Sequence, residues 1–193
     1  MKRIFALSVF CLWPIAASAA EYSSTYTAFD LDRCKVIEKG DEYVYAGTWA
    51  CKGYAGIDII QASSDDRTYV AFGQNGREHC AFRKTFNRFN TALSPVEWRL
   101  KNGKPIAAIE RWSVVTDDEG HSVTWLVINA LRGNDSCHVH YVAGSYPDAN
   151  ADARRAADDL AEDFNCERDA PTVDSTIGEP GIGMSACKDL RAE

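Results

Sequence analysis

Two histidines, His138 and His140, stand two residues apart in a short apolar run. Residues i and i+2 of a β-strand share a face, so the two imidazoles could bind one metal ion, with His79 or His121 completing the site. The alternative is a pair of half-exposed histidines on a polar sheet face. Because no carboxylate stands at a diagnostic spacing, a metal site at His138 and His140 is the less favoured of these two interpretations. We expect no metal and no other cofactor.

Nucleophilic catalysis has no recognisable motif in this chain. No serine lies in a G-x-S-x-G sequence, which would mark a nucleophile held on a strained turn between a strand and a helix. The glycine-rich stretch 178–183 lacks the preceding strand and following helix that a phosphate-binding loop requires. The sequence therefore favours a protein that is not an enzyme, although a site assembled from distant residues would leave no motif.

Basic residues concentrate between residues 77 and 111 of a chain whose net charge is −7. Eight basic residues stand there against three acidic ones, a local charge of +5, and phenylalanines are interleaved with them. Such a segment could hold an anionic envelope component: a glycan, a phospholipid headgroup or an acidic protein surface. The candidate ligand-binding residues are Arg83, Lys84, Arg88, Arg99 and Arg111.

The simpler alternative is that these charges are neutralised within the molecule. Residues 148–169 carry eight acidic residues against three basic ones, a local charge of −5. In that case the aromatic side chains face the core, the basic side chains cover the outside, and the acidic segment compensates them. Both interpretations remain open from the sequence.

The first 20 residues predict a secretory signal peptide. Lys2 and Arg3 precede an apolar run over residues 4–16, and the small residues 17–20 offer a cleavage site after Ala19 or Ala20. The run is shorter than the roughly 20 apolar residues that span a membrane. We therefore expect cleavage, a mature chain in the periplasm or secreted, and no transmembrane segment in that mature chain.

Cleavage would also settle the cysteine count. Cys11 leaves with the signal peptide, and the net charge moves from −7 to −9 because two basic residues leave with it. An even number of cysteines in an oxidising compartment predicts up to three disulfides, whereas zinc would need closely spaced pairs. The remaining cysteines are Cys34, Cys51, Cys80, Cys137, Cys166 and Cys187.

The elements that must position these residues are mainly strands. Residues 26–144 alternate short apolar runs with turn residues, and Asn102-Gly103 predicts a type I′ hairpin between 96–100 and 106–115. Residues 123–131 are apolar on both faces, which predicts a central strand. The expected fold class is mainly β: an antiparallel meander closed as a small barrel or sandwich.

A change of pattern follows the strands. Helical spacing predicts one C-terminal amphipathic helix over about 148–165, within a β-rich domain of residues 21–169. Residues 170–193 predict an irregular tail tethered by a disulfide. The apolar stripe of the helix is Ala153, Ala157, Leu160, Ala161 and Phe164.

Several short motifs resemble those of a group of small exported proteins found in alphaproteobacteria. The likeness covers about residues 26–166, including a helix that ends at Cys166. The motifs are Phe29-Asp-Leu-Asp-Arg-Cys34, Trp49-x-Cys51-x-Gly53-Tyr54, Glu97-Trp98-Arg99 with Gly103-x-Pro105, and Tyr146-Pro147-Asp148-Ala149-Asn150.

The resemblance implies a bacterial periplasm and two bridges, Cys34–Cys51 and Cys137–Cys166, which leaves Cys80 and Cys187 to pair with each other. That group has no assigned activity, so the resemblance implies no catalytic or binding residues. The periplasmic lysozyme inhibitors are also small, β-rich and disulfide-bearing, but the chain lacks a convincing copy of their inhibitory loop, and this analogy rests on fold class and compartment alone.

We therefore expect a non-enzymatic secreted or periplasmic binding or interaction protein. Its partner is an unidentified envelope component or another periplasmic protein, and we expect no nucleic-acid partner. The alternatives are an inhibitor of a wall hydrolase and a small periplasmic hydrolase. A deep cleft in which His138 or His140 is hydrogen-bonded to a buried carboxylate would favour the hydrolase.

Overall fold

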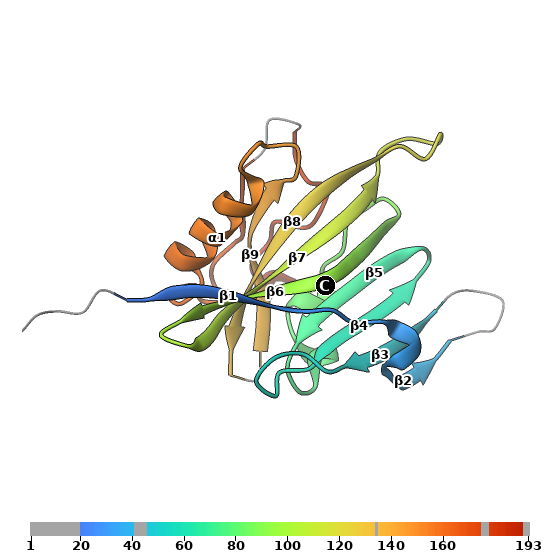
Figure 1. Ribbon diagram of the computed structural model, residues 1–193. Coiled ribbons are helices and arrows are strands. Elements are labelled where there is room, and N and C mark those ends of the chain that lie inside the picture. Colours follow the sequence, from blue (N-terminus) through green and yellow to red (C-terminus); the bar gives the residue numbers. More distant parts are fainter. Residues whose placement is uncertain (1–19, 41–45, 134, 175–177, 191–193) are drawn as a thin grey trace, which may run out of the picture.

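A computed structural model describes residues 20–40, 46–133, 135–174 and 178–190 of the chain; the signal peptide predicted over 1–20 therefore lies outside these residues except for its last position. Two β-sheets and one main helix form three layers, with the six-stranded sheet in the middle (Figure 1). The predicted mainly β class is confirmed. The two sheets are open and packed as a sandwich, and no barrel is closed.

The six-stranded sheet is mixed rather than wholly antiparallel. Its order is β1 (Tyr22–Thr27), β6 (Asn90–Lys101), β7 (Lys104–Val115), β8 (Ser122–Arg132), β9 (Asp135–Ala143) and β10 (Thr172–Asp174). Every pair is antiparallel except β9 and β10, which are parallel. A parallel pair needs a crossover, and helix α1 (Ala149–Leu160) lies in the connection between β9 and β10.

The second sheet is smaller and antiparallel throughout. Its order is β2 (Lys35–Lys39), β3 (Gly47–Cys51), β4 (Ile59–Ser64) and β5 (Arg67–Phe72). The short helices are η1 (Leu31–Arg33), η2 (Gly76–Glu78), η3 (Ala81–Arg83) and α2 (Cys187–Leu190). None of the helices in the described part of the chain is long and apolar enough to cross a membrane.

The longest hairpin forms where the sequence predicts it. Asn102 and Gly103 have φ angles of 50° and 76°, the two positive values that a type I′ turn requires. The turn joins β6 and β7, which are twelve residues long each. The predicted central strand is also confirmed, because β8 lies between β7 and β9.

An aromatic core fills the space between the two sheets. Trp98, Trp112 and Trp125 are all buried on the inner face of the six-stranded sheet. The ring of Phe72 from β5 meets Trp98 edge-on at a centroid distance of 5.4 Å, and Phe86 lies 5.4 Å from Trp112. Aromatic pairs at these separations add to the stability gained from burying their large apolar area.

Alanines spaced four residues apart let α1 pack closely on the outer face of the six-stranded sheet. Ala149, Ala153, Ala157 and Ala161 are all buried there, against apolar residues of β7, β8 and β9. The helix ends at Leu160, five residues before the predicted end. Leu160 was expected in the buried stripe, but it lies beside the alanine line and is 38% exposed.

Ion pairs cross the interface between α1 and the sheet. Arg99 donates two hydrogen bonds to Asp158, Nε to Oδ1 at 2.6 Å and Nη2 to Oδ2 at 2.7 Å. Arg154 of the helix donates from Nε to Oε1 of Glu97 at 2.5 Å. Bidentate pairs of this kind hold both position and orientation. The strand and helix charges therefore compensate each other within the molecule.

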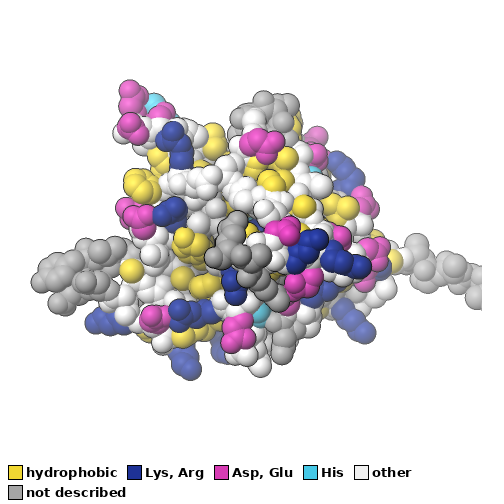
Figure 2. All heavy atoms as spheres, turned by 180° about the vertical axis from the view of Figure 1, so that it is seen from behind, with side chains coloured by type: hydrophobic (Ala, Val, Ile, Leu, Met, Phe, Trp, Pro, Cys, Tyr) yellow, Lys and Arg dark blue, Asp and Glu magenta, His cyan; other side chains and the backbone are white. Residues whose placement is uncertain are grey.

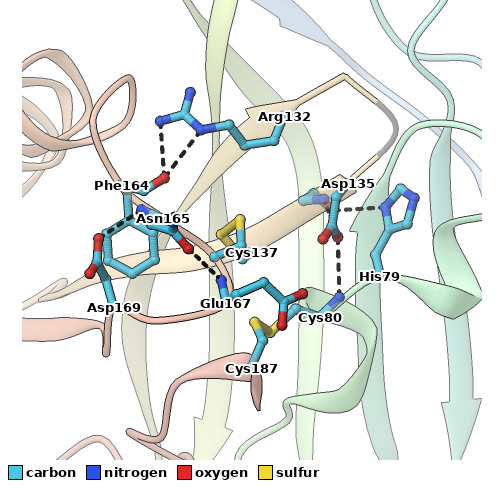
Figure 3. Close-up of a disulfide and its surroundings, with 12 residues drawn as sticks. His79, Cys80, Arg132, Asp135, Cys137, Phe164, Asn165, Glu167, Asp169 and Cys187 are labelled. Carbon is cyan, nitrogen blue, oxygen red and sulfur yellow. Dashed lines mark hydrogen bonds between the residues drawn. A yellow bond between two sulfur atoms is a disulfide. The ribbon is translucent and has the colours of Figure 1, made fainter. Parts of the chain in front are cut away.

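Three disulfides hold the chain together: Cys34–Cys51, Cys80–Cys187 and Cys137–Cys166. The pairing implied by the resemblance is thus the pairing of the structure. The Cys80–Cys187 and Cys137–Cys166 bridges lie near each other (Figure 3). The backbone N–H of Cys187 donates to the carbonyl of Cys166 at 3.3 Å. The tail predicted to be irregular includes two short regular elements, β10 and α2, and its tether is the bridge from Cys187 to Cys80.

The pair between Arg99 and Asp158 gives a test of this interface. Both side chains are largely buried, so Asp158→Asn leaves an uncompensated guanidinium and lowers the free energy of unfolding by about 3 kcal/mol. The matched control is Asp159→Asn, at an exposed neighbouring position, which changes it by less than about 0.5 kcal/mol. Urea unfolding of the oxidised protein measures both, and equal values for the two variants would contradict the assignment.

Candidate functional site

An open groove with a volume of about 690 Å³ lies between the two sheets in the described part of the chain. Its residues come from η1, β4, β5, β6 and β7, so distant segments meet there. Cavities of a few hundred to a thousand Å³ hold small ligands or a few units of a polymer. We call this hollow the inter-sheet groove, and it is the candidate functional site.

One wall of the inter-sheet groove is the segment that contains η1. The backbone N–H of Phe29 donates to Oγ of Ser94 at 3.0 Å, which fixes the start of the wall to β6. Asp30 accepts from the N–H of Asp32 at 3.1 Å through Oδ1 and so begins the short helix. The Cys34–Cys51 bridge anchors the other end to β3. Both carboxylates are thereby held at the edge of the groove.

The opposite wall depends on Asn90, which is 4% exposed. Its Oδ1 accepts from the N–H of Thr68 at 3.1 Å, and its Nδ2 donates to the carbonyls of Phe86 and Arg88. The carbonyl of Phe89 in turn accepts from the N–H of Val115 at 2.9 Å. These bonds fix the backbone of the loop that carries Phe89, whose side chain remains 54% exposed at the groove.

Gln61 has an unused polar atom at this site. It lies on β4, is 4% exposed, and contributes to the lining of the inter-sheet groove. Its Oε1 is buried and has no hydrogen-bond partner among the described residues. A buried acceptor without a partner is costly, and most such atoms in proteins are paired. The atom has almost no accessible surface, so it lies behind the lining of the groove rather than facing it.

The charge of the inter-sheet groove is negative. Asp30, Asp32 and Asp66 line it, and none of the described lining residues is Lys, Arg or His. Carboxylates accept hydrogen bonds and do not donate them when ionised. The three carboxylates stand among hydroxyl and amide side chains that can donate as well as accept, with apolar side chains beside them.

A second hollow of about 610 Å³ adjoins the inter-sheet groove and shares Phe89 and Val115 with it. Arg67 lines this hollow and pairs with Asp65 at 2.5 Å. Arg88 also lines it, together with Asp117 and Asp118. Phe89 and Val115 therefore mark the place where the two hollows adjoin.

The five basic residues predicted to bind a ligand are not brought together. Arg99 is paired with Asp158 under α1, and Arg111 donates to Oδ1 of Asn150 at 2.8 Å. Lys84 is 3% exposed, and its Nζ donates to the carbonyls of Gly183 and Ser185 at 3.0 and 2.6 Å. Burial lowers the pKa of Lys84 to about 8. The two hydrogen bonds to Gly183 and Ser185 hold the tail against Lys84.

Arg83 and Arg88 are exposed, and neither makes an ion pair within the described part of the chain. Of the five, only Arg88 reaches a hollow next to the inter-sheet groove. Figure 2 shows that acidic and basic side chains are interspersed over the rear face of the molecule, without a broad field of one sign. Ligand binding by the basic residues stays a prediction.

His138 and His140 do not share a face of the sheet. The expectation that the two imidazoles lie on one face, where they could bind one metal ion, is therefore wrong. A register shift in the pairing of β8 with β9 inserts Val139 as an extra residue, so that Asn129 is opposite His138 and Ile128 is opposite His140. Such a bulge reverses the alternation of side chains. No group of three or more His, Cys, Asp or Glu residues suited to a metal is found among the described residues.

His140 lies beneath the tail on the helix side of the sheet. Its Nδ1 is 2.6 Å from Oγ1 of Thr172, and its Nε2 is 3.3 Å from Oδ2 of Asp174. Burial lowers the pKa of His140, while the nearby Asp174 acts in the opposite direction. The Asp174 side chain is 65% exposed, and neither residue lines the inter-sheet groove. The cleft and buried carboxylate that would favour a hydrolase are therefore not found at this histidine.

A buried polar cluster lies on the inner face of the six-stranded sheet. Glu110 accepts from Nε1 of Trp112 at 2.8 Å, and Nδ1 of His138 is 2.9 Å from the hydroxyl of Tyr141. Asn129 is directly opposite His138 in the ladder. Burial raises the pKa of Glu110 to about 8, and burial together with the charge of Lys84 lowers the pKa of His138 to about 3. Both side chains are therefore neutral near pH 7.

Sequence reasoning missed the inter-sheet groove because its residues are ordinary and far apart. Gln61 and Asn90 stand in no motif, and their roles appear only when β4, β5 and β6 are placed together. One signal was present: Phe29, Asp30 and Asp32 belong to the first motif of the resemblance, where they were not assigned a function.

The comparisons with known proteins add no relative. No protein-family model matches the chain, and no match was found among curated proteins or solved structures. The function must therefore be inferred from the residues of the site.

The buried polar cluster predicts an unusual dependence of stability on pH. The pKa of Glu110 is raised from 4.5 to about 8, so the native protein holds a proton that the unfolded chain has lost between these values. The contribution of Glu110 is therefore fully present below about pH 4.5 and is lost as the pH rises toward 8, by about 1.4 kcal/mol per pH unit. Burial of neutral His138 acts oppositely, with stability lost as the pH falls from 6.5 toward 3.

The variant Glu110→Gln separates the contribution of Glu110 to the pH dependence of stability from that of His138. The unfolding free energy of the wild type minus that of the variant should be constant below about pH 4.5 and fall between about pH 4.5 and 8. Urea unfolding across this pH range measures the difference. A difference that does not change with pH would show that Glu110 titrates normally in the folded protein.

Proposed function

We propose that this chain is an exported, non-enzymatic binding protein and that the inter-sheet groove holds its ligand. The observation that carries the proposal is the groove itself, an open hollow of about 690 Å³ whose lining joins residues of both sheets to the segment that contains η1. The exposed ring of Phe89 beside it gives an apolar contact surface. Apolar area with a few fixed polar groups is the usual composition of a ligand site.

The walls support a site that is formed before the ligand arrives. Asn90 fixes one wall through hydrogen bonds to three backbone groups, and the Cys34–Cys51 bridge secures the other. A preformed site loses less conformational entropy on binding than a flexible one does. The arrangement therefore suits recognition of a ligand rather than packing alone.

Export and a periplasmic or secreted location remain part of the proposal. Three disulfides in a chain of this length are typical of an oxidising compartment. The apolar run after Lys2 and Arg3 agrees with that compartment. The ligand is then an envelope component or another protein of the same compartment.

The positions of the histidines support binding without catalysis. His138 is buried between the sheets, His140 lies beneath the tail, and His79 is hydrogen-bonded to Ser136 at 3.2 Å. His121 lies at the tip of the hairpin between β7 and β8, next to Asp117. None of the four lines the inter-sheet groove, so the groove has no imidazole for proton transfer.

The predicted anionic ligand would have to use Arg83 and Arg88, the two exposed basic residues of the original five. Because Arg99, Arg111 and Lys84 are engaged elsewhere, the proposed function rests on the groove and not on the basic segment. Arg83→Glu/Arg88→Glu therefore serves as a comparison in the test of the groove.

Filling the groove tests the proposed function. Thr91 is an exposed residue of β6 on the groove lining, so Thr91→Trp occupies the groove without entering the core. The matched control is Ser122→Trp, an exposed strand position outside the lining of the groove. The oxidised proteins are immobilised and exposed to a bacterial envelope extract, and the retained material is identified by mass spectrometry.

We expect the wild type, the control and Arg83→Glu/Arg88→Glu to retain the same component and Thr91→Trp to lose it. Equal thermal unfolding of Thr91→Trp and the control shows that the loss is local. Retention by Thr91→Trp would contradict the assignment of the groove. Loss only in the double arginine variant would transfer the site to the basic segment.

A further inference from the structure

We propose that two copies of this chain associate through β1, the free edge of the six-stranded sheet, and pair there as antiparallel strands across a two-fold axis. In the described part of the chain, β1 has β6 on one side and no strand on the other. An edge strand presents backbone N–H and C=O groups that can pair with another strand. This surface is separate from the inter-sheet groove, whose lining begins at Phe29, so the inference goes beyond the proposed function.

The sequence of β1 has none of the features that protect an edge strand. Proteins protect such edges with charged residues, proline, bulges or very short strands. Residues 22–27 contain no charged residue and no proline, and their pairing with β6 is unbroken over all six residues. The strand consists of Tyr, Ser and Thr, and both Tyr and Thr favour β structure. β1 is therefore suited to accept a further strand.

The other edges of the two sheets in the described chain are each protected. β2 has a register shift within it and a lysine at each end. β10 is three residues long. β5 is covered within the molecule, because the N–H of Thr68 donates to Oδ1 of Asn90 and the N–H of Phe72 donates to Oγ of Ser136. This contrast distinguishes β1 from the rest.

The register of β1 shows which backbone groups face the free side. The N–H of Asn102 donates to the carbonyl of Glu21 at 2.8 Å, so the backbone of Glu21 faces β6 and the turn after it. In an antiparallel pair, successive residues direct their backbone groups alternately toward the partner strand and away from it. The N–H and C=O groups of Tyr22, Ser24 and Tyr26 consequently point to the free side.

A two-fold axis at Ser24 satisfies all of these groups. It places Ser24 opposite Ser24 of the second copy and Tyr22 opposite Tyr26 of the second copy, and residues paired in this way exchange two backbone hydrogen bonds. Between these pairs, Ser23 lies opposite Thr25 of the second copy on the other face. Every pair therefore joins two aromatic or two hydroxyl side chains, and both kinds of pair stabilise neighbouring strands.

The ring of Tyr26 provides the apolar part of this contact. It is 53% exposed, and its hydroxyl accepts a hydrogen bond from Nη2 of Arg154 at 2.9 Å. The ring is thus held in place before association. Pairing with Tyr22 of the second copy would remove much of it from water, and aromatic pairs across strands add to the stability of a sheet.

The surroundings of β1 are electrically neutral, although the chain carries a net charge of −7. The three residues of β6 opposite the outward-facing residues of β1 are all charged, and each has a partner of opposite charge from α1 or the turn after it. Two acidic chains can therefore approach at this edge without strong repulsion. The pairs are Lys101 with Glu162, Arg99 with Asp158, and Glu97 with Arg154.

The test compares Ser24→Pro with Ser24→Ala. Proline at this position removes an outward N–H and keeps the bonds to β6, because edge strands accept proline where the N–H faces solvent. Alanine is the matched control: both variants lose the hydroxyl that donates to Glu97 and accepts from Arg99, but alanine keeps the N–H. Sedimentation velocity of the exported, oxidised proteins from about 10 μM to about 500 μM measures association. Thermal unfolding shows that each variant is folded.

We expect the wild type and Ser24→Ala to form dimers with a dissociation constant of about 10–100 μM, because a single pair of strands is a small interface. Ser24→Pro should weaken association by about tenfold or more. A second measurement uses the wild type alone: as its concentration rises, the amides of Tyr22, Ser24 and Tyr26 should become protected from hydrogen exchange.

A wild type that stays monomeric at about 500 μM would reject the second copy as the occupant. If the three outward amides then gain protection only when envelope extract is added, the edge takes a strand of another protein instead. A dimer that folded Ser24→Pro leaves unchanged, without concentration-dependent protection of the three amides, would locate the interface elsewhere on the chain. The proposed function is unaffected by any of these results, because Thr91→Trp tests the groove separately.

Discussion

Burial of the six-stranded sheet on both faces is the constraint on which the rest of the structure depends. Helix α1 covers one face and the four-stranded sheet covers the other, so the middle parts of β7, β8 and β9 are buried on both sides. Polar side chains on these strands must therefore find partners within the protein or stay neutral. Glu110 of β7 and His138 of β9 are neutral for this reason, and Arg99 of the neighbouring β6 is paired with Asp158 of α1. The inter-sheet groove is one place where residues of both sheets remain accessible.

Local rules made much of the fold predictable. Asn102-Gly103 can adopt two positive φ angles cheaply, so the hairpin between β6 and β7 could be predicted from two residues. The run 123–131 has apolar residues on both faces because its strand is covered on both sides. The outer face of β6 was harder to interpret: Glu97 looks exposed in the alternation, yet it is 7% exposed because Arg154 of α1 covers and neutralises it.

Neither the candidate site nor the arrangement of the two histidines could be predicted, and the physical reasons differ. The residues of the groove belong to segments around 29–32, 61–68, 89–94 and 113–115, and only the packing of two sheets brings these together. The histidine pair failed because alternation assumes an unbroken ladder, and one inserted residue, Val139, reverses it. The charge asymmetry of the sequence was real, but the structure uses much of it to join α1 to β6.

The structure thus separates two uses of charge. Pairs beneath α1 hold the layers together, whereas the carboxylates of the inter-sheet groove have no basic partner in the described lining. The most direct measurement is the map of amide chemical shifts by NMR on titration with the envelope component that the immobilised wild type retains. The account predicts that the side-chain amide of Gln61 and the backbone amides of Phe89 and Thr91 shift together at one saturating site. Shifts confined to the segment around Arg83 and Arg88, with Gln61 unchanged, would contradict it.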